Sequence, residues 1–307
     1  MLGGLRRTGV RVYEQLLERE LEGAPDHVAV IQDGNRRYAE ARGEERTAGH
    51  RAGAETTEAM LRWCRDLGVE ELTLYAFSTE NFERPPEERE ALFDLIESKL
   101  RDFADREEVH ENAVRIRAVG ETERLPERVQ DAVADADRRT HGYDGLYLNV
   151  ALAYGGRAQL LNAARSVARD IHAGTLAPAD VDAAELDRRL TTRPSRAVDL
   201  IIRTGGAERT SNFLPWHANG NEAAVFFCTP YWPEFRRVDF LRAIRTYEAR
   251  QESWRRTRAR RALALVSTLR DAELSEAWGV LGRLHGSLRE EELAEADVDT
   301  AAGEPAD

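Results

Sequence analysis

Residues 27–37 read HVAVIQDGNRR, a short apolar run that stops abruptly at an Asp-Gly-Asn turn beginning at Asp33. An apolar run of this length, bounded by turn residues, predicts a buried β-strand over 27–32. Ligands of open α/β sheets bind just beyond the carboxyl ends of the strands. Asp33 therefore occupies a position suited to a catalytic carboxylate, and Arg36 and Arg37 follow where an anion would need them. Taken alone, the stretch also fits an ordinary strand-to-helix turn with a solvated basic patch.

Further apolar runs of strand length alternate with helical patterns along the chain. Strands are predicted at 27–32, 72–77, 114–119, 146–152, 198–202 and 223–227, and helices at 47–67, 87–106, 156–172, 178–190 and 235–269, with another beginning at Pro126. This alternation predicts a single α/β domain with a mostly parallel six-stranded sheet flanked by helices. We find no linker and no internal repeat that would divide it.

The composition limits the class of protein. With 42% hydrophobic residues, 307 residues and no apolar run near the length of a membrane span, the chain should fold around a full core. Its first residues do not form a signal peptide, and Cys64 and Cys228 form no motif, so a cytoplasmic location fits. None of the Walker, dinucleotide-binding, zinc-binding or Asp-Asp-x-x-Asp patterns occurs.

The charge is strongly acidic. Asp and Glu total 56 against 44 basic residues, and Lys99 is the only lysine. An acidic, lysine-poor surface indicates a protein from a halophile, although a GC-rich genome would also favour arginine over lysine. Net acidity argues against nucleic-acid binding, but an anionic substrate requires only a local group of arginines.

The two ends of the chain differ from its centre. Residues 1–24 show the spacing of an amphipathic helix, and 251–289 are expected to form a helical extension. The arginines at 255–261 fit a solvated helix face, and a contact with the anionic inner face of a membrane is the sharper alternative. The acidic tail, 290–307, is expected to be disordered.

Three polar loops follow strands, after residues 32, 77 and 202, and should open at one edge of the sheet. They and the residues near them contain two acids, two amides, several arginines, one histidine and one serine: Asp33, Glu80, Asn35, Asn81, Arg36, Arg37, Arg46, Arg84, Arg203, Arg209, His50 and Ser211. Guanidinium groups bind phosphate oxygens as planar forks and stay charged. The loops therefore predict a polyanion site, such as one for a diphosphate, and Asp33 could hold Mg²⁺ beside it.

Six motifs in order closely resemble those of the cis-prenyltransferases, the undecaprenyl or polyprenyl diphosphate synthases, over about 27–250 of the chain. They are HVAVIQDGNRRYA (27–39), R-x-x-G-H-R-x-G (46–53), LTLYAFSTENFERP (72–85), LNVALAYGGR (148–157), DLIIRTGGAERTSNFLPW (199–216) and YWPEF (231–235). The resemblance implies a catalytic domain over 25–250. It also implies the repeated addition of isopentenyl diphosphate to an allylic diphosphate, with each new double bond cis, to make the precursor of a lipid glycosyl carrier.

The resemblance also implies roles for individual residues. Asp33 brings Mg²⁺ to the allylic diphosphate, and Glu222 completes the metal site across the interface of a homodimer. The cradle of the allylic diphosphate comprises Gly34, Asn35, Arg36, Arg37, Arg46 and His50; the isopentenyl diphosphate site comprises Arg203, Arg209 and Ser211; and Tyr38, Ser78, Thr79, Glu80, Phe82, Arg84 and Thr210 lie near the substrates. Asn81 assists proton removal with Ser78. Because an amide is a weak base, we expect Asn81 to orient the substrate while a diphosphate oxygen takes the proton.

The hydrocarbon product requires an apolar tunnel, and the resemblance places one here. One wall is predicted from the helical stripe Leu92, Phe93, Ile96, Leu100 and Phe103. The alternative interpretation of that stripe is ordinary core packing.

Arg36-Arg37-Tyr38 resembles the archaeal and eukaryotic branch of the family, which implies a dolichol-type product and a geranylgeranyl or farnesyl diphosphate primer. Glu208 and the long loop before Glu222 depart from the bacterial pattern. Two alternatives remain. A non-catalytic partner subunit of a heteromeric enzyme would typically lack Asp33 and several arginines, and a phosphohydrolase would need a nucleophile or a fuller metal cluster.

Overall fold

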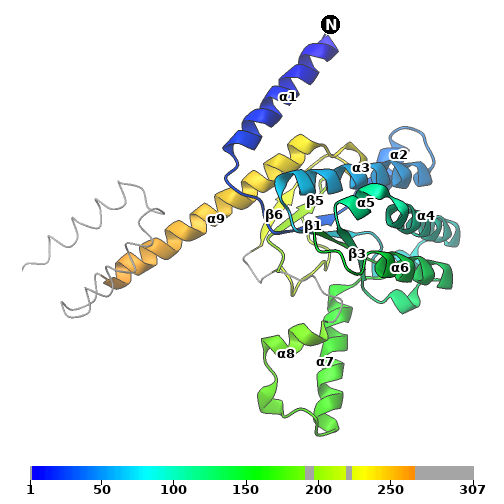
Figure 1. Cartoon of the computed structure of the whole chain (residues 1–307), viewed down its shortest axis with the longest axis vertical. Helices are drawn as coiled ribbons and strands as arrows, with labels where there is room; N and C mark the ends of the chain where they lie inside the picture. The colour runs from blue at the N-terminus through cyan, green and yellow to red at the C-terminus, as the bar shows by residue number, and fades with distance from the viewer. Residues whose placement is uncertain (1, 191–196, 219–222, 267–307) are drawn as a thin grey trace, which may run out of the picture. The chain divides into compact units, whose positions relative to one another are not determined.

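The computed structural model describes residues 2–190, 197–218 and 223–266 (Figure 1). The chain divides into two compact units, 1–247 and 248–307, and the described strands all lie in the first. These strands are β1 (His27–Ile31), β2 (Glu71–Tyr75), β3 (Val114–Val119), β4 (Leu146–Ala151), β5 (Leu200–Arg203) and β6 (Ala224–Phe227). They form one sheet in the order β3-β4-β2-β1-β5-β6, with every pairing parallel. The predicted parallel sheet of six strands is confirmed.

The described helices are α1 (Leu2–Glu20), α2 (Asn35–Glu40), α3 (Arg46–Leu67), α4 (Pro86–Asp105), α5 (Glu107–Glu111), α6 (Glu127–Arg139), α7 (Gly156–His172), α8 (Ala183–Arg189) and α9 (Arg237–Val266), with short 3₁₀ turns η1 (Thr79–Glu83), η2 (Thr122–Arg124), η3 (Pro178–Asp180) and η4 (Trp232–Glu234). The helices predicted at 47–67, 87–106, 156–172 and from Pro126 are confirmed to within a few residues, whereas the short helices α2 and α5 were not predicted. The short helix α2 follows directly from the Asp-Gly-Asn turn. Its Arg36 and Arg37 are therefore held on a helix at the edge of the sheet.

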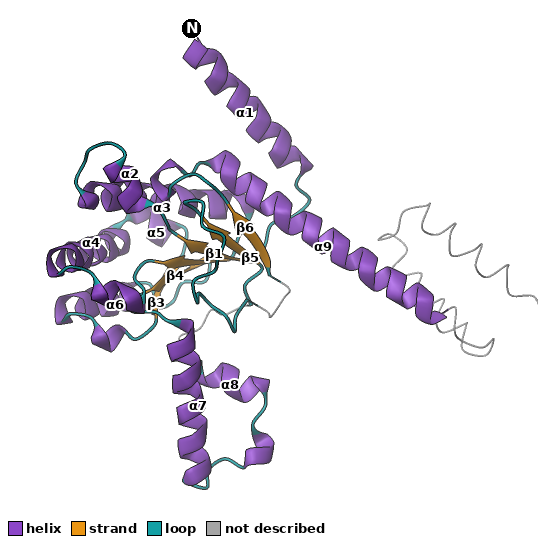
Figure 2. Ribbon diagram, turned by 180° about the vertical axis from the view of Figure 1, so that it is seen from behind, coloured by secondary structure: helices purple, strands orange, loops and turns teal. Residues whose placement is uncertain are grey.

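The two faces of the sheet bury cores of different size, because successive side chains of a strand point to opposite faces. Val28 and Val30 of β1 lie in the larger core, which also contains side chains of α3, α4, α6 and α9. Ala29 and Ile31 lie in the smaller core, which the segment around Phe213 covers. Figure 2 shows the strands beside α3, α4 and α6. The full burial of β1 explains why its sequence is a continuous apolar run.

The strand order brings the three polar loops together. β1 lies between β2 and β5, and the chain moves to one side of β1 for β2 to β4 and then to the other side for β5. Such a reversal leaves a crevice at the carboxyl ends of the two strands on either side of it. The residues that follow β1 and β5, Asp33 and Thr204, therefore face each other. Ser78, after β2, lies on the other side of β1.

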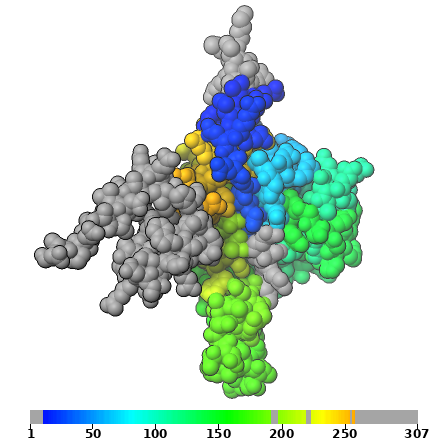
Figure 3. Space-filling model, turned by 60° about the vertical axis from the view of Figure 1, so that its left-hand side comes forward, coloured from blue at the N-terminus to red at the C-terminus, as the bar shows by residue number. Residues whose placement is uncertain are grey.

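The predicted N-terminal helix is present as α1. Its Leu17 is buried against Val238 and Leu241 of α9, and Arg237 donates two hydrogen bonds, of 2.8 and 3.0 Å, to the carboxylate of Glu18. α7 and α8 pack against each other, and their exposed side chains fill the lower part of the view in Figure 3. None of the helices in the described ranges is long and apolar enough to cross a membrane. The predicted acidic tail, 290–307, and the extension beyond Val266 lie outside the described residues.

Candidate functional site

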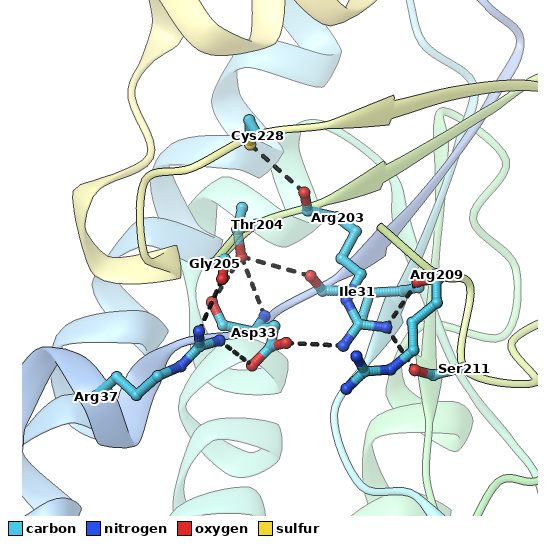
Figure 4. Close-up of polar contacts among 9 residues, drawn as sticks. All are labelled: Ile31, Asp33, Arg37, Arg203, Thr204, Gly205, Arg209, Ser211 and Cys228. Carbon is cyan, nitrogen blue, oxygen red and sulfur yellow. Dashed lines mark hydrogen bonds and ion pairs between the residues drawn. The ribbon is translucent and has the colours of Figure 1, made fainter. Parts of the chain in front are cut away.

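Asp33 is held by two arginines that come from different elements (Figure 4). Arg37 donates a hydrogen bond of 2.9 Å to one carboxylate oxygen, and Arg203 donates one of 2.8 Å to the other. Arg37 lies four residues later on α2, whereas Arg203 is the last residue of β5. The carboxylate therefore joins the loop after β1 to the loop after β5.

Hydrogen bonds between side chains and the backbone fix the same two loops. The Thr204 hydroxyl donates to the Asp33 carbonyl oxygen at 2.7 Å and accepts from the Asp33 amide at 3.0 Å. Arg37 also donates to the carbonyl oxygen of Gly205 at 2.8 Å. Gly205 has φ of 80°, and a Cβ added there would lie 2.6 Å from the Arg37 guanidinium. The turn therefore requires glycine both for its backbone conformation and for the close approach of this arginine.

Arg203 is hydrogen-bonded to two other predicted residues of the loop after β5. It is only 4% exposed, and it donates to the carbonyl oxygen of Arg209 at 2.6 Å and to the Ser211 hydroxyl. The Arg209 side chain is exposed at the rim, beside Arg203 (Figure 4). Thr210 lies in the same turn, where its carbonyl oxygen accepts from the amide of Phe213. The four predicted residues are therefore neighbours.

The charge of Asp33 is secure at neutral pH. Burial of the carboxyl tends to raise its pKa, but the hydrogen bond from Arg203 and the nearby charges of Arg37 and Arg203 outweigh burial. The pKa of Asp33 therefore lies below its ordinary value, and the site offers an ionised carboxylate.

A pocket of about 330 Å³ lies beside Asp33, which forms part of its lining. It is lined by Gln32, Asp33, Gly34, Asn35, Arg36, Arg37, Glu40, His50 and Arg84. Arg46 lies close by and pairs with Glu40 at 3.3 Å. Most of the predicted allylic cradle is thus brought together, in a pocket whose guanidinium groups come from α2 and from the turn before α4.

His50 lies in the wall of this pocket as a neutral ring. Burial lowers its pKa to about 4, with a further contribution from Arg84 and an opposing one from Glu88. Its Nε2 atom and the side-chain oxygen of Asn35 are buried and have no hydrogen-bond partner among the described residues. Buried polar atoms without partners are rare, and these two are suited to contact a bound ligand.

The loop after β2 has a local structural role. The amide of Ser78 donates to the side-chain oxygen of Asn81 at 2.9 Å, within a capping box that starts η1. Thr79 bonds through its amide to the Tyr154 carbonyl oxygen, and Glu80 is exposed. Phe82 packs edge-on against Phe77 with ring centres 5.0 Å apart. The part that these five predicted residues play in catalysis stays a prediction.

Of the two remaining predicted positions, Tyr38 does not line the pocket. Tyr38 stacks with Arg42, whose guanidinium carbon lies 3.7 Å from the ring centre. Glu222 lies outside the described residues.

An apolar pocket of about 120 Å³ adjoins the charged one and shares Gln32, Asn35 and His50 with it. Four residues of the predicted α4 stripe line it: Leu92, Ile96, Leu100 and Phe103. A third pocket, of about 300 Å³, shares Phe103 and Leu148 with the second. Apolar space between α3, α4 and the strands therefore adjoins the charged pocket at the edge of the sheet.

Several contributors were missed by sequence reasoning. Thr204 ties the two loops, and Gln32 lines both pockets. Glu88 is buried and contacts three of the predicted arginines. The one available signal was that Glu88 lies four residues after Arg84, a spacing that places two side chains on the same face of a helix.

The described residues contain no group of three or more His, Cys, Asp or Glu side chains placed to hold a metal ion. Asp33 lines the charged pocket and is paired with Arg37 and Arg203. Mg²⁺ commonly takes one or two protein carboxylates and completes its shell with substrate phosphate oxygens and water. An ionised carboxylate beside an anion pocket fits that arrangement.

Comparison with known proteins identifies the family. The sequence profile described as "Putative undecaprenyl diphosphate synthase" matches residues 31–255. The tritrans,polycis-undecaprenyl-diphosphate synthase (geranylgeranyl-diphosphate specific) of Halobacterium salinarum is 66% identical, over 94% of this chain and 96% of that protein. The protein of the same name from Haloarcula marismortui is 62% identical, over 97% and 98%.

Solved structures agree. Lavandulyl diphosphate synthase from Lavandula x intermedia, in complex with dimethylallyl diphosphate, superposes with a TM-score of 0.69 at 34% identity, covering 73% of this chain and 95% of that one. A probable undecaprenyl diphosphate synthase from Campylobacter jejuni gives a TM-score of 0.59 at 29% identity, with the same coverage. The profile match, the haloarchaeal relatives and the shared fold show that this chain belongs to the cis-prenyltransferase family and is of its archaeal type.

Proposed function

We propose that this transferase of prenyl groups adds isopentenyl diphosphate repeatedly to geranylgeranyl diphosphate and so makes a long-chain polyprenyl diphosphate for a lipid glycosyl carrier. The observation that carries the proposal is the position of Asp33 between Arg37 and Arg203, beside an arginine-lined pocket that adjoins an apolar one. The primer follows from the names of the relatives in Halobacterium salinarum and Haloarcula marismortui. Farnesyl diphosphate is the competing primer.

The allylic diphosphate would occupy the pocket lined by Arg36, Arg37 and Arg84. Charge develops on this group as it leaves, and fixed guanidinium groups stabilise that charge without having to reorganise. The neutral ring of His50 would donate one hydrogen bond to a phosphate oxygen. The side-chain oxygen of Asn35 has no hydrogen-bond partner among the described residues. In the enzyme–substrate complex it would accept a hydrogen bond.

Mg²⁺ fits this site through Asp33. When bound with a diphosphate it supplies Lewis-acid stabilisation of the charge on the leaving oxygens. Arg37 and Arg203 keep Asp33 ionised at neutral pH, so its carboxylate would be available to bind the metal ion. Glu222 is proposed as the second protein ligand, from the other subunit of a homodimer.

Isopentenyl diphosphate would bind at the loop after β5. Arg209 is exposed there and Arg203 is fixed by Ser211, so the loop presents one adaptable and one rigid guanidinium. We assign the orientation of the reacting end to Asn81 with Ser78, and removal of the proton to a diphosphate oxygen.

The apolar pocket beside His50 would take the growing hydrocarbon. Leu92, Ile96 and Leu100 of α4 line it, and the third pocket, which shares Phe103 and Leu148 with it, would give further room to a longer chain. A peripheral contact with the membrane would serve the release of such a product, and the arginines at 255–261 remain the proposed surface for it.

The partner-subunit alternative is not favoured. Relatives that match 94% or more of this chain are named as synthases, and Asp33, Arg37 and Arg203 are all present and paired. A phosphohydrolase would need a fuller metal cluster than the described residues hold.

The test is the condensation of radiolabelled isopentenyl diphosphate by Asp33→Ala. We expect this variant to keep its fold and to lose most turnover. Asp137→Ala is the matched control, because it also deprives a buried arginine, Arg115, of its carboxylate but lies on α6. Near-normal condensation by Asp33→Ala would contradict the proposed mechanism.

A second measurement decides the primer. The wild-type enzyme is given geranylgeranyl and farnesyl diphosphate in competition, and its lipid products are analysed by mass spectrometry. We expect products whose length reflects the geranylgeranyl primer. Products built on the farnesyl primer would reject the proposed specificity and leave the reaction type intact.

A further inference from the structure

Glu88 is a buried carboxylate that the proposed mechanism does not use. It lies in the first turn of α4, and its side chain is 8% exposed. One of its oxygens, Oε2, has no hydrogen-bond partner among the described residues. A buried carboxylate is costly unless charges and donors surround it, so its position here calls for a partner of opposite charge.

Three arginines from three different segments provide that charge. Arg84, in the turn before α4, pairs with Oε1. Arg36 of α2 approaches the same oxygen at 3.5 Å, and Arg46, the first residue of α3, approaches Oε2 at 3.6 Å. One carboxylate thus holds the guanidinium groups of α2, α3 and the turn before α4 near one another.

The residues that line the charged pocket include Arg36 and Arg84 but not Glu88. Glu88 therefore contacts these arginines from outside the pocket lining, while their remaining donors stay available. Glu40 also pairs with Arg46, so three positive groups stand against two negative ones and leave one excess positive charge for an anion to neutralise. Without Glu88 the three guanidinium groups would repel one another and move apart.

We propose that Glu88 is a positioning residue that holds Arg36, Arg46 and Arg84 at the spacing that a diphosphate requires. It acts through the arginines and has no contact with the reacting atoms. The inference rests on the proposed function only in taking the ligand to be a diphosphate.

Positioning and simple electrostatics predict opposite signs. A negative charge near an anion site weakens anion binding by repulsion, so loss of that charge alone would tighten binding. If Glu88 positions the arginines, its loss weakens binding although the protein gains positive charge. The direction of the change in Glu88→Gln therefore separates the two roles.

The first experiment is calorimetric titration of the full chain with inorganic pyrophosphate. We expect the dissociation constant to rise about tenfold in Glu88→Gln, which corresponds to about 1.4 kcal/mol. Glu88→Asp keeps the charge on a side chain one methylene shorter, so its affinity should fall between that of Glu88→Gln and that of the wild type. The matched control is Glu185→Gln on α8, whose side chain is 10% exposed and paired with Arg188 and Arg189, and it should bind as the wild type does.

The second experiment is steady-state kinetics with the two substrates varied separately. We expect Glu88→Gln to raise the KM for the allylic diphosphate about tenfold and to leave the KM for isopentenyl diphosphate within about twofold. A merely structural loss would lower the active fraction and leave both KM values unchanged.

Unchanged or tighter pyrophosphate binding by folded Glu88→Gln overturns the proposal, and so does an equal loss in Glu185→Gln. If Glu88→Gln does not fold, Glu88→Asp decides, and an affinity equal to that of the wild type together with unchanged KM values then refutes the role. A wild-type enzyme that binds pyrophosphate but adds no isopentenyl diphosphate refutes the proposed function, and the binding comparison still tests Glu88.

Discussion

At the scale of the residue, the burial of Arg203 decides what the loss of Asp33 does to stability. Arg203 is 4% exposed, so Asp33→Ala leaves an almost fully buried guanidinium without its carboxylate. We expect unfolding free energy to fall by about 2 kcal/mol, as when a buried charged group loses its hydrogen-bond partner. Chemical denaturation measures this loss.

Added pyrophosphate provides the control for that prediction. It offers oxygens to Arg37 and Arg203 in place of the missing carboxylate, so it should return part of the lost stability. A loss of stability that pyrophosphate leaves unchanged would mean that the two arginines do not face a common anion site.

His50 predicts a specific dependence on pH. Burial first, and then Arg84 and Arg36, lower its pKa from 6.5 to about 4, against the opposing charge of Glu88. Between these values the unfolded chain binds a proton that the folded chain does not, so stability falls as pH drops. Over the whole pH range between the two pKa values, the free energy of unfolding should change by roughly 3 kcal/mol.

The measurement compares denaturant unfolding of the wild type and His50→Gln from about pH 7 down to about pH 4.5. The wild type should lose more stability across this range than the variant. Parallel curves would show that His50 titrates near its ordinary value in the folded protein.

Much of the residue-scale picture could be predicted, for a reason specific to Asp33 and Arg203. Both stand at the ends of apolar runs, and turn chemistry at a strand end is visible in the sequence. Glu88 could not be found this way, because its partners Arg36 and Arg46 approach from other segments. Asn81 shows the opposite limit, since its capping bond to Ser78 is local and its part in catalysis is not visible in that bond.

At the scale of the element, the packing of α2 on α3 depends on Gly49. A Cβ added to this residue of α3 would lie 1.9 Å from the Asn35 carbonyl oxygen at the start of α2. Gly49→Ala should therefore displace α2, which carries Arg36 and Arg37, and lower both stability and affinity for pyrophosphate. We expect a destabilisation of about 2–3 kcal/mol by overpacking.

Gly142→Ala is the control for this effect, because a Cβ at that position meets no atom within 4 Å. Calorimetric unfolding and pyrophosphate titration of the two variants compare them directly. Equal behaviour of the pair would show that α2 is not held by its contact with α3.

Helix α4 offers a test of the tunnel against ordinary core packing. Leu100 lines the apolar pocket, so Leu100→Trp should fill it and shorten the polyprenyl product. Ala132 on α6 is buried in the same core but is absent from the pocket lining. Ala132→Leu should therefore destabilise the protein by about 1–3 kcal/mol without changing the product.

Mass spectrometry of the lipids from both variants provides the comparison. If Leu100→Trp lowers stability and leaves the product length unchanged, the α4 stripe is core only.

The elements themselves were largely predictable, and their neighbours were not. The sequence pattern indicated every strand of the described sheet, most clearly β1 and β5, because full burial makes these two strands largely apolar. The order in which strands pair depends on contacts between distant residues, as between Val28 of β1 and Leu200 of β5. Periodicity carries no information on such pairings, so the position of β1 between β2 and β5 had to come from the structure.

At the scale of the whole molecule, the excess of negative charge should control stability in salt. The chain carries a formal charge of −12 and a single lysine. Salt screens repulsion among exposed charges, so we expect the Tm to rise between roughly 0.1 and 2 M potassium chloride. A falling Tm would mean that salt mainly weakens the many surface ion pairs, and it would argue against a halophilic adaptation.

The shared carboxylate of Asp33 has a consequence for how the two substrates bind. Arg37 serves one proposed substrate site and Arg203 the other, and both hold the same side chain. An anion that draws one arginine away changes the hold of the other, so the two binding equilibria are thermodynamically linked. Such linkage is reciprocal: each diphosphate must alter the affinity for the other by the same factor. In an enzyme that repeats one condensation many times, the affinity of each diphosphate site would therefore depend, at every cycle, on whether the other diphosphate site is occupied.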